Sequence, residues 1–248
     1  MTQPIQALRP PVEAKDRVII ALDVPSEVDA RRAVDELKGR VGAFKVGLQL
    51  FTAAGPGFVR ELTAAGYKVF LDLKFHDIPN TVAAACVAAA RLGVWMLNVH
   101  ACGGAEMMRS ASSQTREMCI REGLAAPMII GVTVLTSLDG KTLGETGVID
   151  QPEDQVVRLA RLAESAGLDG VVASPREAGL VKQNISRRGF CIVTPGIRAA
   201  SGTKDDQKRV TTVREAFANG SDYVVIGRPV MGANDRVAAL EALLGDVK

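Results

Sequence analysis

The stretch Leu71-Asp72-Leu73-Lys74-Phe75-His76-Asp77-Ile78-Pro79-Asn80-Thr81 decides the fold, because it joins a core strand to a helix and carries charges at the junction. It continues the apolar run 67–71, which indicates a strand. Because a strand alternates its faces, Asp72 and Lys74 are predicted to share one face. Acidic and basic side chains that alternate at the end of a core strand are costly to bury, so the stretch indicates a chemical site.

A helix is predicted directly after this strand. Pro79 ends the strand, and Asn80 is predicted to cap a helix that continues through the alanine-rich run after Val82 to about residue 92. The same unit recurs along the chain. Further strands are predicted at 17–23, 43–48, 94–99, 128–134, 169–173, 190–194 and 223–226. Further helices are predicted at 26–38, 52–65, 105–122, near 143, at 152–166, at 174–184 with Ser174-Pro175 as its start, at 213–218 and at 230–244.

Eight short apolar strands, each followed by a helix, predict an α/β protein with a parallel sheet. Eight such units fit a closed (β/α)8 TIM barrel in a single domain, which leaves no strand edge exposed. A doubly wound open sheet is the alternative. No G-x-G-x-x-G motif follows the first strand, which disfavours a dinucleotide-binding form of that sheet. The predicted division is an N-terminal arm at 1–15 and a catalytic barrel at 16–248.

Composition narrows the class of protein and its partners. The chain has 248 residues, of which 47% are hydrophobic and 23% charged, as in globular proteins. A net charge of +2 and only 4% aromatic residues give no reason to expect nucleic acid or a membrane surface as a partner. The four cysteines form no C-x-x-C pair, and the N-terminus does not resemble a signal peptide. We therefore expect a cytoplasmic protein without a bound metal.

Charged and polar residues gather where the predicted strands end, which is where TIM barrels carry their active sites. Asp23 ends the first strand, Lys45 lies in the second, and Asp72 and Lys74 end the third. Each of these residues alone could be a cap or a surface charge. Together they would meet at one barrel mouth, where an alternating chain of acids and bases keeps the lysines protonated and the acids ionised. His76 and His100 are interpreted as structural and stay outside the catalytic set.

The end of the eighth strand is typical of a phosphate site. Loops after the seventh and eighth strands of such barrels often bind phosphate through backbone N–H groups. Gly227 has no side chain, so a phosphate could approach the backbone closely there, and Arg228 supplies a guanidinium group to bind it. Arg198 and Gln207 lie in the long loop 198–209, whose polar, glycine-containing sequence suits a closing lid. A surface loop without function is the alternative for that segment.

Six sequence blocks, in their order along the chain, resemble the orotidine 5′-phosphate decarboxylase family. They are Leu22-Asp23-Val24-Pro25, Lys45-Val46-Gly47, the stretch 72–81, Val132-Thr133-Val134-Leu135-Thr136-Ser137, Thr194-Pro195-Gly196-Ile197-Arg198 and Gly227-Arg228-Pro229. The D-x-K-x-x-D element alone is shared with relatives that act on other sugar phosphates. The extended tail 75–81 and the full set of blocks are more specific.

The resemblance implies decarboxylation of orotidine 5′-monophosphate (OMP) to UMP in pyrimidine biosynthesis, without metal or organic cofactor. It implies a homodimer with shared active sites, in which Asp77 comes from the partner subunit. The catalytic residues would be Lys45, Asp72, Lys74 and Asp77, with Lys74 stabilising and protonating a carbanion at C6 of the pyrimidine. The substrate-binding residues would be Asp23, Lys45, Asp72, Asp77, Ile78, Thr81, Thr136, Pro195, Arg198, Gln207, Gly227 and Arg228.

Two other functions remain open from the sequence. One is a magnesium-dependent 3-keto-gulonate-phosphate decarboxylase or hexulose-phosphate synthase, which shares the barrel and the D-x-K-x-x-D element. The other is a non-catalytic nucleotide-binding barrel. The intact set Lys45, Asp72, Lys74 and Asp77 disfavours the second, because a binding protein has no need to hold Lys74 among acids.

Overall fold

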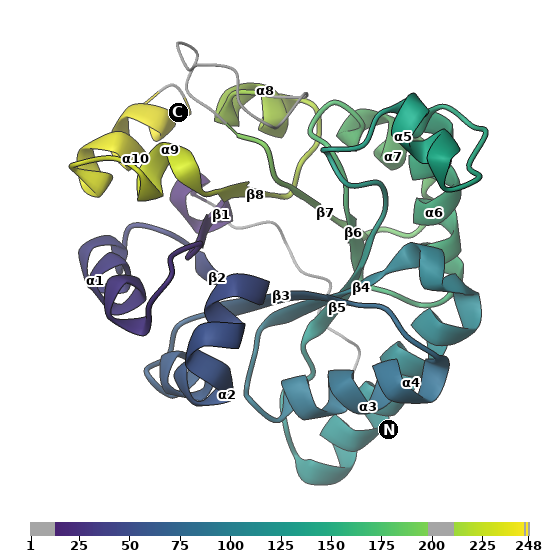
Figure 1. Ribbon diagram of the computed structural model, residues 1–248, viewed down its shortest axis with the longest axis horizontal. Coiled ribbons are helices and arrows are strands. Elements are labelled where there is room, and N and C mark those ends of the chain that lie inside the picture. Colours follow the sequence, from purple (N-terminus) through teal and green to yellow (C-terminus); the bar gives the residue numbers. More distant parts are fainter. Residues whose placement is uncertain (1–12, 198–210, 246, 248) are drawn as a thin grey trace.

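The chain folds into a closed barrel of eight parallel strands (Figure 1). The structure is a computed structural model that describes residues 13–197, 211–245 and 247. Each strand pairs with its neighbour in the sequence, and β8 pairs with β1 to close the ring. The strands are β1 Val18–Ala21, β2 Ala43–Gly47, β3 Val69–Phe75, β4 Met96–His100, β5 Met128–Val132, β6 Gly170–Val172, β7 Cys191–Thr194 and β8 Tyr223–Ile226. The predicted (β/α)8 barrel is confirmed.

Helices surround the barrel; α1 to α8 lie between consecutive strands along the chain, and α9 and α10 follow β8 (Figure 1). They are α1 Glu27–Leu37, α2 Leu48–Ala64, α3 Pro79–Ala90, α4 Gly104–Glu122, α5 Gly140–Glu145, α6 Pro152–Ser165, α7 Ala178–Asn184, α8 Val213–Ala218, α9 Arg228–Met231 and α10 Arg236–Leu244. Two 3-10 turns, η1 Ala14–Arg17 and η2 Ala101–Gly103, precede β1 and follow β4. The boundary of the predicted arm at residue 15 falls within η1, and residues 1–12 lie outside the described residues.

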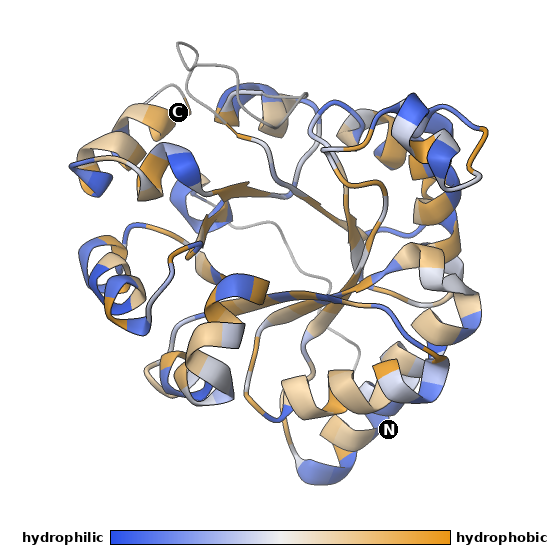
Figure 2. Cartoon of the chain, in the orientation of Figure 1, coloured by the Kyte–Doolittle hydropathy of each residue, from blue (hydrophilic) through white to orange (hydrophobic). Residues whose placement is uncertain are grey.

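The strands are apolar on both faces because both faces are buried (Figure 2). Ile19, Phe70, Met96 and Ile130 belong to a cluster inside the barrel. Their neighbours along the strands, such as Leu71, pack under the surrounding helices. Since side chains two apart share a face, Asp72 follows Phe70 into the interior at the C-terminal end of β3. Because side chains alternate along β3, the Asp72 carboxylate lies inside the barrel at its C-terminal mouth.

The start of α3 differs from the prediction. Ile78, and not Asn80, occupies the N-cap position, and Pro79 is the first residue of the helix. Proline suits this position because its fixed φ is helical and its missing N–H would have had no partner within the helix. Asn80 therefore lies inside the first turn.

Two further helix predictions were wrong in detail. The predicted start at Ser174-Pro175 is a turn, in which the Glu177 carboxylate accepts from the Ser174 N–H, and α7 begins only at Ala178. The helix predicted at 230–244 is divided into α9 and α10, because the Asp235 carboxylate accepts from the Ala238 N–H and starts a new helix. Within the described ranges, no helix combines the length and apolar character that crossing a membrane requires.

Candidate active site

The mouth of the barrel holds two adjoining hollows of about 340 Å³ each. They share six lining residues, which are Lys45, Asp72, Lys74, Pro195, Val225 and Arg228. One hollow continues to Asp23 and Gly227, and the other to Val134 and Thr136. The cavity therefore has a charged half and a more apolar half, with the lysines and Asp72 between them.

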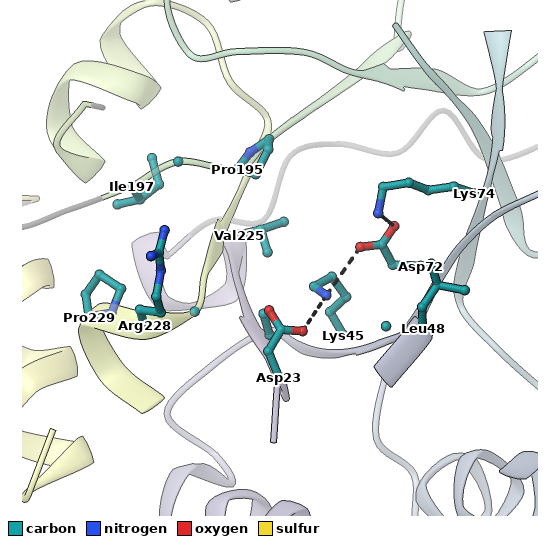
Figure 3. Close-up of a pocket in the computed structure, with 14 residues that line it drawn as sticks. Asp23, Lys45, Leu48, Asp72, Lys74, Pro195, Ile197, Val225, Arg228 and Pro229 are labelled. Carbon is teal, nitrogen blue, oxygen red and sulfur yellow. Dashed lines mark hydrogen bonds and ion pairs between the residues drawn. The ribbon is translucent and has the colours of Figure 1, made fainter. Parts of the chain in front are cut away.

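Four charged side chains, from β2, from β3 and from the segment after β1, form one chain across this cavity (Figure 3). Lys45 Nζ lies 2.9 Å from Asp23 Oδ1 and 3.3 Å from Asp72 Oδ2. Lys74 Nζ lies 2.7 Å from Asp72 Oδ1. The alternating order Asp23–Lys45–Asp72–Lys74 is the arrangement that the sequence pattern predicts for these residues.

The inner pair of this chain is the most buried part. The side chains of Lys45 and Asp72 are 9% and 12% exposed, whereas that of Asp23 is 53% exposed. Burial alone would raise the pKa of Asp72, but Lys45 and Lys74 outweigh it and hold that pKa below its usual value. Burial would likewise lower the pKa of Lys45, but Asp72 and Asp23 outweigh it and raise that pKa. Both groups are therefore charged at neutral pH.

Gly47 leaves room for this network at the end of β2. A Cβ at this position would lie 2.9 Å from Lys45 Nζ and 3.4 Å from Asp23 Oδ1. A larger residue would therefore press against the ion pair between those two side chains.

The backbone of β3 is distorted where it carries Lys74. Leu71 pairs with Leu97, but the next pair is Phe75 with Val99, so β3 uses four residues where β4 uses two. Lys74 has φ 52°, and it is the one non-glycine residue with a positive φ in the part of the chain that the structure describes. The simple alternation that the sequence suggests therefore stops at Lys74, although its side chain still reaches the cavity.

Asn98 on β4 makes hydrogen bonds to both Lys74 and Asp72 of the distorted segment of β3. Its Oδ1 accepts from the Lys74 backbone N–H at 2.8 Å, and its Nδ2 donates to Asp72 Oδ1 at 2.7 Å. The sequence places Asn98 at a strand end but gives no sign of this contact, because nothing local predicts the bulge in β3.

The predicted phosphate site is described in part. Arg228 is the first residue of α9 and lines both hollows, with Gly227 before it and Pro195 at the end of the neighbouring strand β7 (Figure 3). Arg198, Gln207 and the predicted lid at 198–209 lie outside the described residues.

Three predicted site residues do not line either hollow. Asp77, Ile78 and Thr81 are exposed beyond the end of β3, and Ile78 is 67% exposed. The Asp77 carboxylate accepts from the Ile78 backbone N–H at 2.6 Å. Within one chain these residues therefore stand apart from the charged network.

The two histidines also lie outside the hollows. The rings of His76 and His100 are 5.5 Å apart, and burial, His76 and Lys74 lower the pKa of His100. Among the described residues, no group of three or more histidine, cysteine or acidic side chains is placed to hold a metal ion.

Known proteins resemble the chain over almost its full length. The model of the orotidine 5′-phosphate decarboxylase / HUMPS family matches residues 16–243. Orotidine 5′-phosphate decarboxylase of Moorella thermoacetica is 51% identical over 238 residues, which cover 96% of this chain and 94% of that relative. The enzyme of the same name from Syntrophotalea carbinolica is 50% identical and covers 95% of this chain and 96% of its own.

Solved structures agree with these sequence relatives. Orotidine 5′-phosphate decarboxylase from Lactobacillus acidophilus has a TM-score of 0.78 and 38% identity, and the match covers 92% of this chain and 97% of that one. An uncharacterized conserved protein from Geobacillus kaustophilus has a TM-score of 0.79 and 37% identity over 93% of this chain and 100% of that chain. The chain belongs to the orotidine 5′-phosphate decarboxylase / HUMPS family.

Proposed function

We propose that this chain decarboxylates OMP to UMP in pyrimidine biosynthesis, with Lys74 as the acid that replaces CO2 by a proton. The relatives at about half identity bear the name of this decarboxylase. The observation that carries the mechanism is the chain Asp23–Lys45–Asp72–Lys74 across the cavity. It sets a carboxylate and an ammonium group side by side at the point where the two hollows meet.

The reaction needs a carbanion to be stabilised. When the C6–carboxylate bond breaks, CO2 leaves and the electron pair stays on C6. Lys74 lies beside the developing negative charge and then transfers a proton to C6. Asp72 faces the substrate carboxylate, and the repulsion between the two falls as CO2 departs. Catalysis requires that the interaction of Lys74 with the developing carbanion be more favourable than its interaction with the carboxylate of the bound substrate.

The rest of the cavity binds the nucleotide. Asp23 and Lys45 contact the ribose hydroxyls, and Thr136 contacts the pyrimidine. Gly227 and Arg228 hold the phosphate. Arg198 and Gln207, which lie outside the described residues, are proposed to bind the phosphate as well, and Pro195 to contact the substrate. Binding of the phosphate, far from C6, supplies free energy that orders the reacting groups.

We further propose a homodimer in the cytoplasm. The family resemblance implies a site shared between subunits, and Asp77, Ile78 and Thr81 are exposed beyond the end of β3, where a second subunit can reach them. In the dimer these residues would complete the site of the partner subunit. The four free cysteines among the described residues suit a reducing compartment.

The test is the loss of OMP absorbance with purified protein, with and without EDTA. We expect UMP as the product and the same rate in both samples. Absence of OMP turnover, together with turnover of a hexulose phosphate or 3-keto-gulonate phosphate that EDTA abolishes, would favour the magnesium-dependent chemistry. Binding of UMP without any turnover of OMP would favour a non-catalytic nucleotide-binding barrel. Either result would contradict the proposal.

A further inference from the structure

The side chain of Asn98 is buried behind the charged network and does not line the cavity. The residue is 1% exposed, and neither hollow includes it. Its amide makes one hydrogen bond to the backbone of Lys74 and one to the carboxylate of Asp72. A single side chain thus links the two residues to which the mechanism assigns the chemistry.

The bond to Lys74 concerns the backbone. A residue with a Cβ is disfavoured at positive φ, so φ 52° at Lys74 must be held by its surroundings. Lys74 has no paired residue on either neighbouring strand, because the pairing of β3 with β2 ends at Asp72 and the register with β4 shifts between Leu71 and Phe75. Asn98 Oδ1 takes the place of the missing acceptor. The bond therefore favours the backbone conformation from which the Lys74 side chain reaches the cavity.

The bond to Asp72 concerns the orientation of a carboxylate. Asp72 Oδ1 accepts from Asn98 Nδ2 and Lys74 Nζ, each at 2.7 Å, while Oδ2 faces Lys45 Nζ at 3.3 Å. Three donors from three directions fix the plane of the carboxylate. The amide cannot be reversed, because its NH2 group would then face the Lys74 N–H and its oxygen would face a carboxylate oxygen.

We infer that Asn98 is a positioning residue for decarboxylation, which acts by holding the Asp72 carboxylate and the Lys74 backbone in their catalytic geometry. The inference rests on the proposed function. A displacement of reacting groups by about 1 Å can lower a rate about 100-fold, so loss of this amide should lower kcat strongly. Asn98 touches no part of the cavity, so ground-state binding of the nucleotide should change little.

The experiment compares Asn98→Ala and Asn98→Asp with wild type. The aspartate has the same shape and can still accept from the Lys74 N–H, but when ionised it cannot donate to Asp72. If the alanine variant does not fold, the aspartate variant decides. Ser112→Ala is the matched control, because the buried Ser112 hydroxyl donates to the Gly167 carbonyl on the outside of the barrel. That variant also loses one side-chain hydrogen bond, but at a place remote from the cavity.

We expect kcat to fall about 10- to 100-fold in both Asn98 variants, with UMP affinity within about threefold of wild type. The Ser112 control should keep kcat within about twofold. A negative charge beside Asp72 disfavours its ionised form, so the acid limb of the kcat/KM profile of Asn98→Asp should move to higher pH.

Two results would overturn the inference. One is a kcat of Asn98→Asp within about twofold of wild type. The other is a loss of UMP affinity in proportion to the loss of kcat, which would indicate general disruption of the site. An inactive wild type would instead contradict the proposed function, and this inference with it.

Discussion

At the scale of the residue, Asp72 is the centre of the site because its carboxylate forms ion pairs with both Lys45 and Lys74. Two opposite charges about 4 Å apart attract by about 4 kcal/mol at an effective dielectric constant near 20. Asp72 lies within that distance of both Lys45 and Lys74, and Lys45 also reaches Asp23. The four charges sum to zero, which makes their burial at the barrel mouth tolerable. Removal of one acid would leave a cation in excess.

The lowered pKa of Asp72 makes its contribution to stability depend on pH. A group whose pKa is lowered by folding stabilises the protein above its unfolded pKa, about 3.9 for aspartate, and this contribution is lost as pH falls through the folded value. We therefore expect Asp72→Asn to reduce the free energy of unfolding by up to about 3 kcal/mol at pH 7. The difference from wild type should shrink below about pH 4, as measured by urea unfolding.

An exposed carboxylate provides the control for this measurement. Asp35 is 70% exposed and pairs with Lys38 on the surface of α1. Asp35→Asn should change the free energy of unfolding by less than about 1 kcal/mol at any pH. Equal effects of the two substitutions at pH 7 would contradict the buried network as a source of stability.

At the scale of the element, the contact between β6 and β7 depends on a glycine. Gly170 opens β6 and pairs with Cys191 on β7. A Cβ at residue 170 would lie 2.2 Å from the Cys191 carbonyl oxygen and 2.8 Å from its Cβ. The obstacle is backbone, which cannot turn aside as a flexible side chain could. The two strands can approach in this way only without a side chain at Gly170.

We accordingly predict that Gly170→Ala lowers the free energy of unfolding by about 1–3 kcal/mol, which is the usual cost of overpacking. Gly144→Ala is the control, because Gly144 lies within α5 and, apart from its chain neighbours and the backbone of its own helix, no described atom would lie within 4 Å of the added Cβ. Alanine there should be neutral or should stabilise by up to about 1 kcal/mol. Chemical unfolding of the three proteins measures both effects. Equal stability of Gly170→Ala and wild type would show that the strands can separate without cost.

The elements themselves follow closely from local sequence, because buried parallel strands are continuous apolar runs and helices end at glycines. The errors arise where two local rules compete. Ser174-Pro175 looks like a helix start, but the Glu177 carboxylate takes up the Ser174 N–H and forms a turn instead. The bulge in β3 has no local signature at all. It depends on Asn98, which lies 24 residues beyond Lys74 along the chain, so it requires the assembled sheet.

At the scale of the whole molecule, closure of the barrel brings together residues that are far apart in the chain. Asp23, Lys45 and Asp72 meet because the C-terminal ends of neighbouring parallel strands lie at one rim, and Arg228 joins them because β8 pairs with β1. This part of the site could be predicted from strand order alone. The position of Asp77 relative to a second subunit could not, because no pattern within one chain specifies the geometry of its partner.

A mixing experiment tests the proposed sharing of sites between subunits. Lys74→Ala and Asp77→Ala should each be inactive, since each homodimer lacks one required group in both sites. In a heterodimer of the two variants, one site has neither group and the other has both. Random exchange of equal amounts should therefore restore about a quarter of the wild-type activity per active site. Each variant mixed with itself is the control, and differently tagged subunits recovered together prove that exchange has occurred. Proven exchange without recovery of activity would mean that Asp77 acts within its own subunit, or not at all.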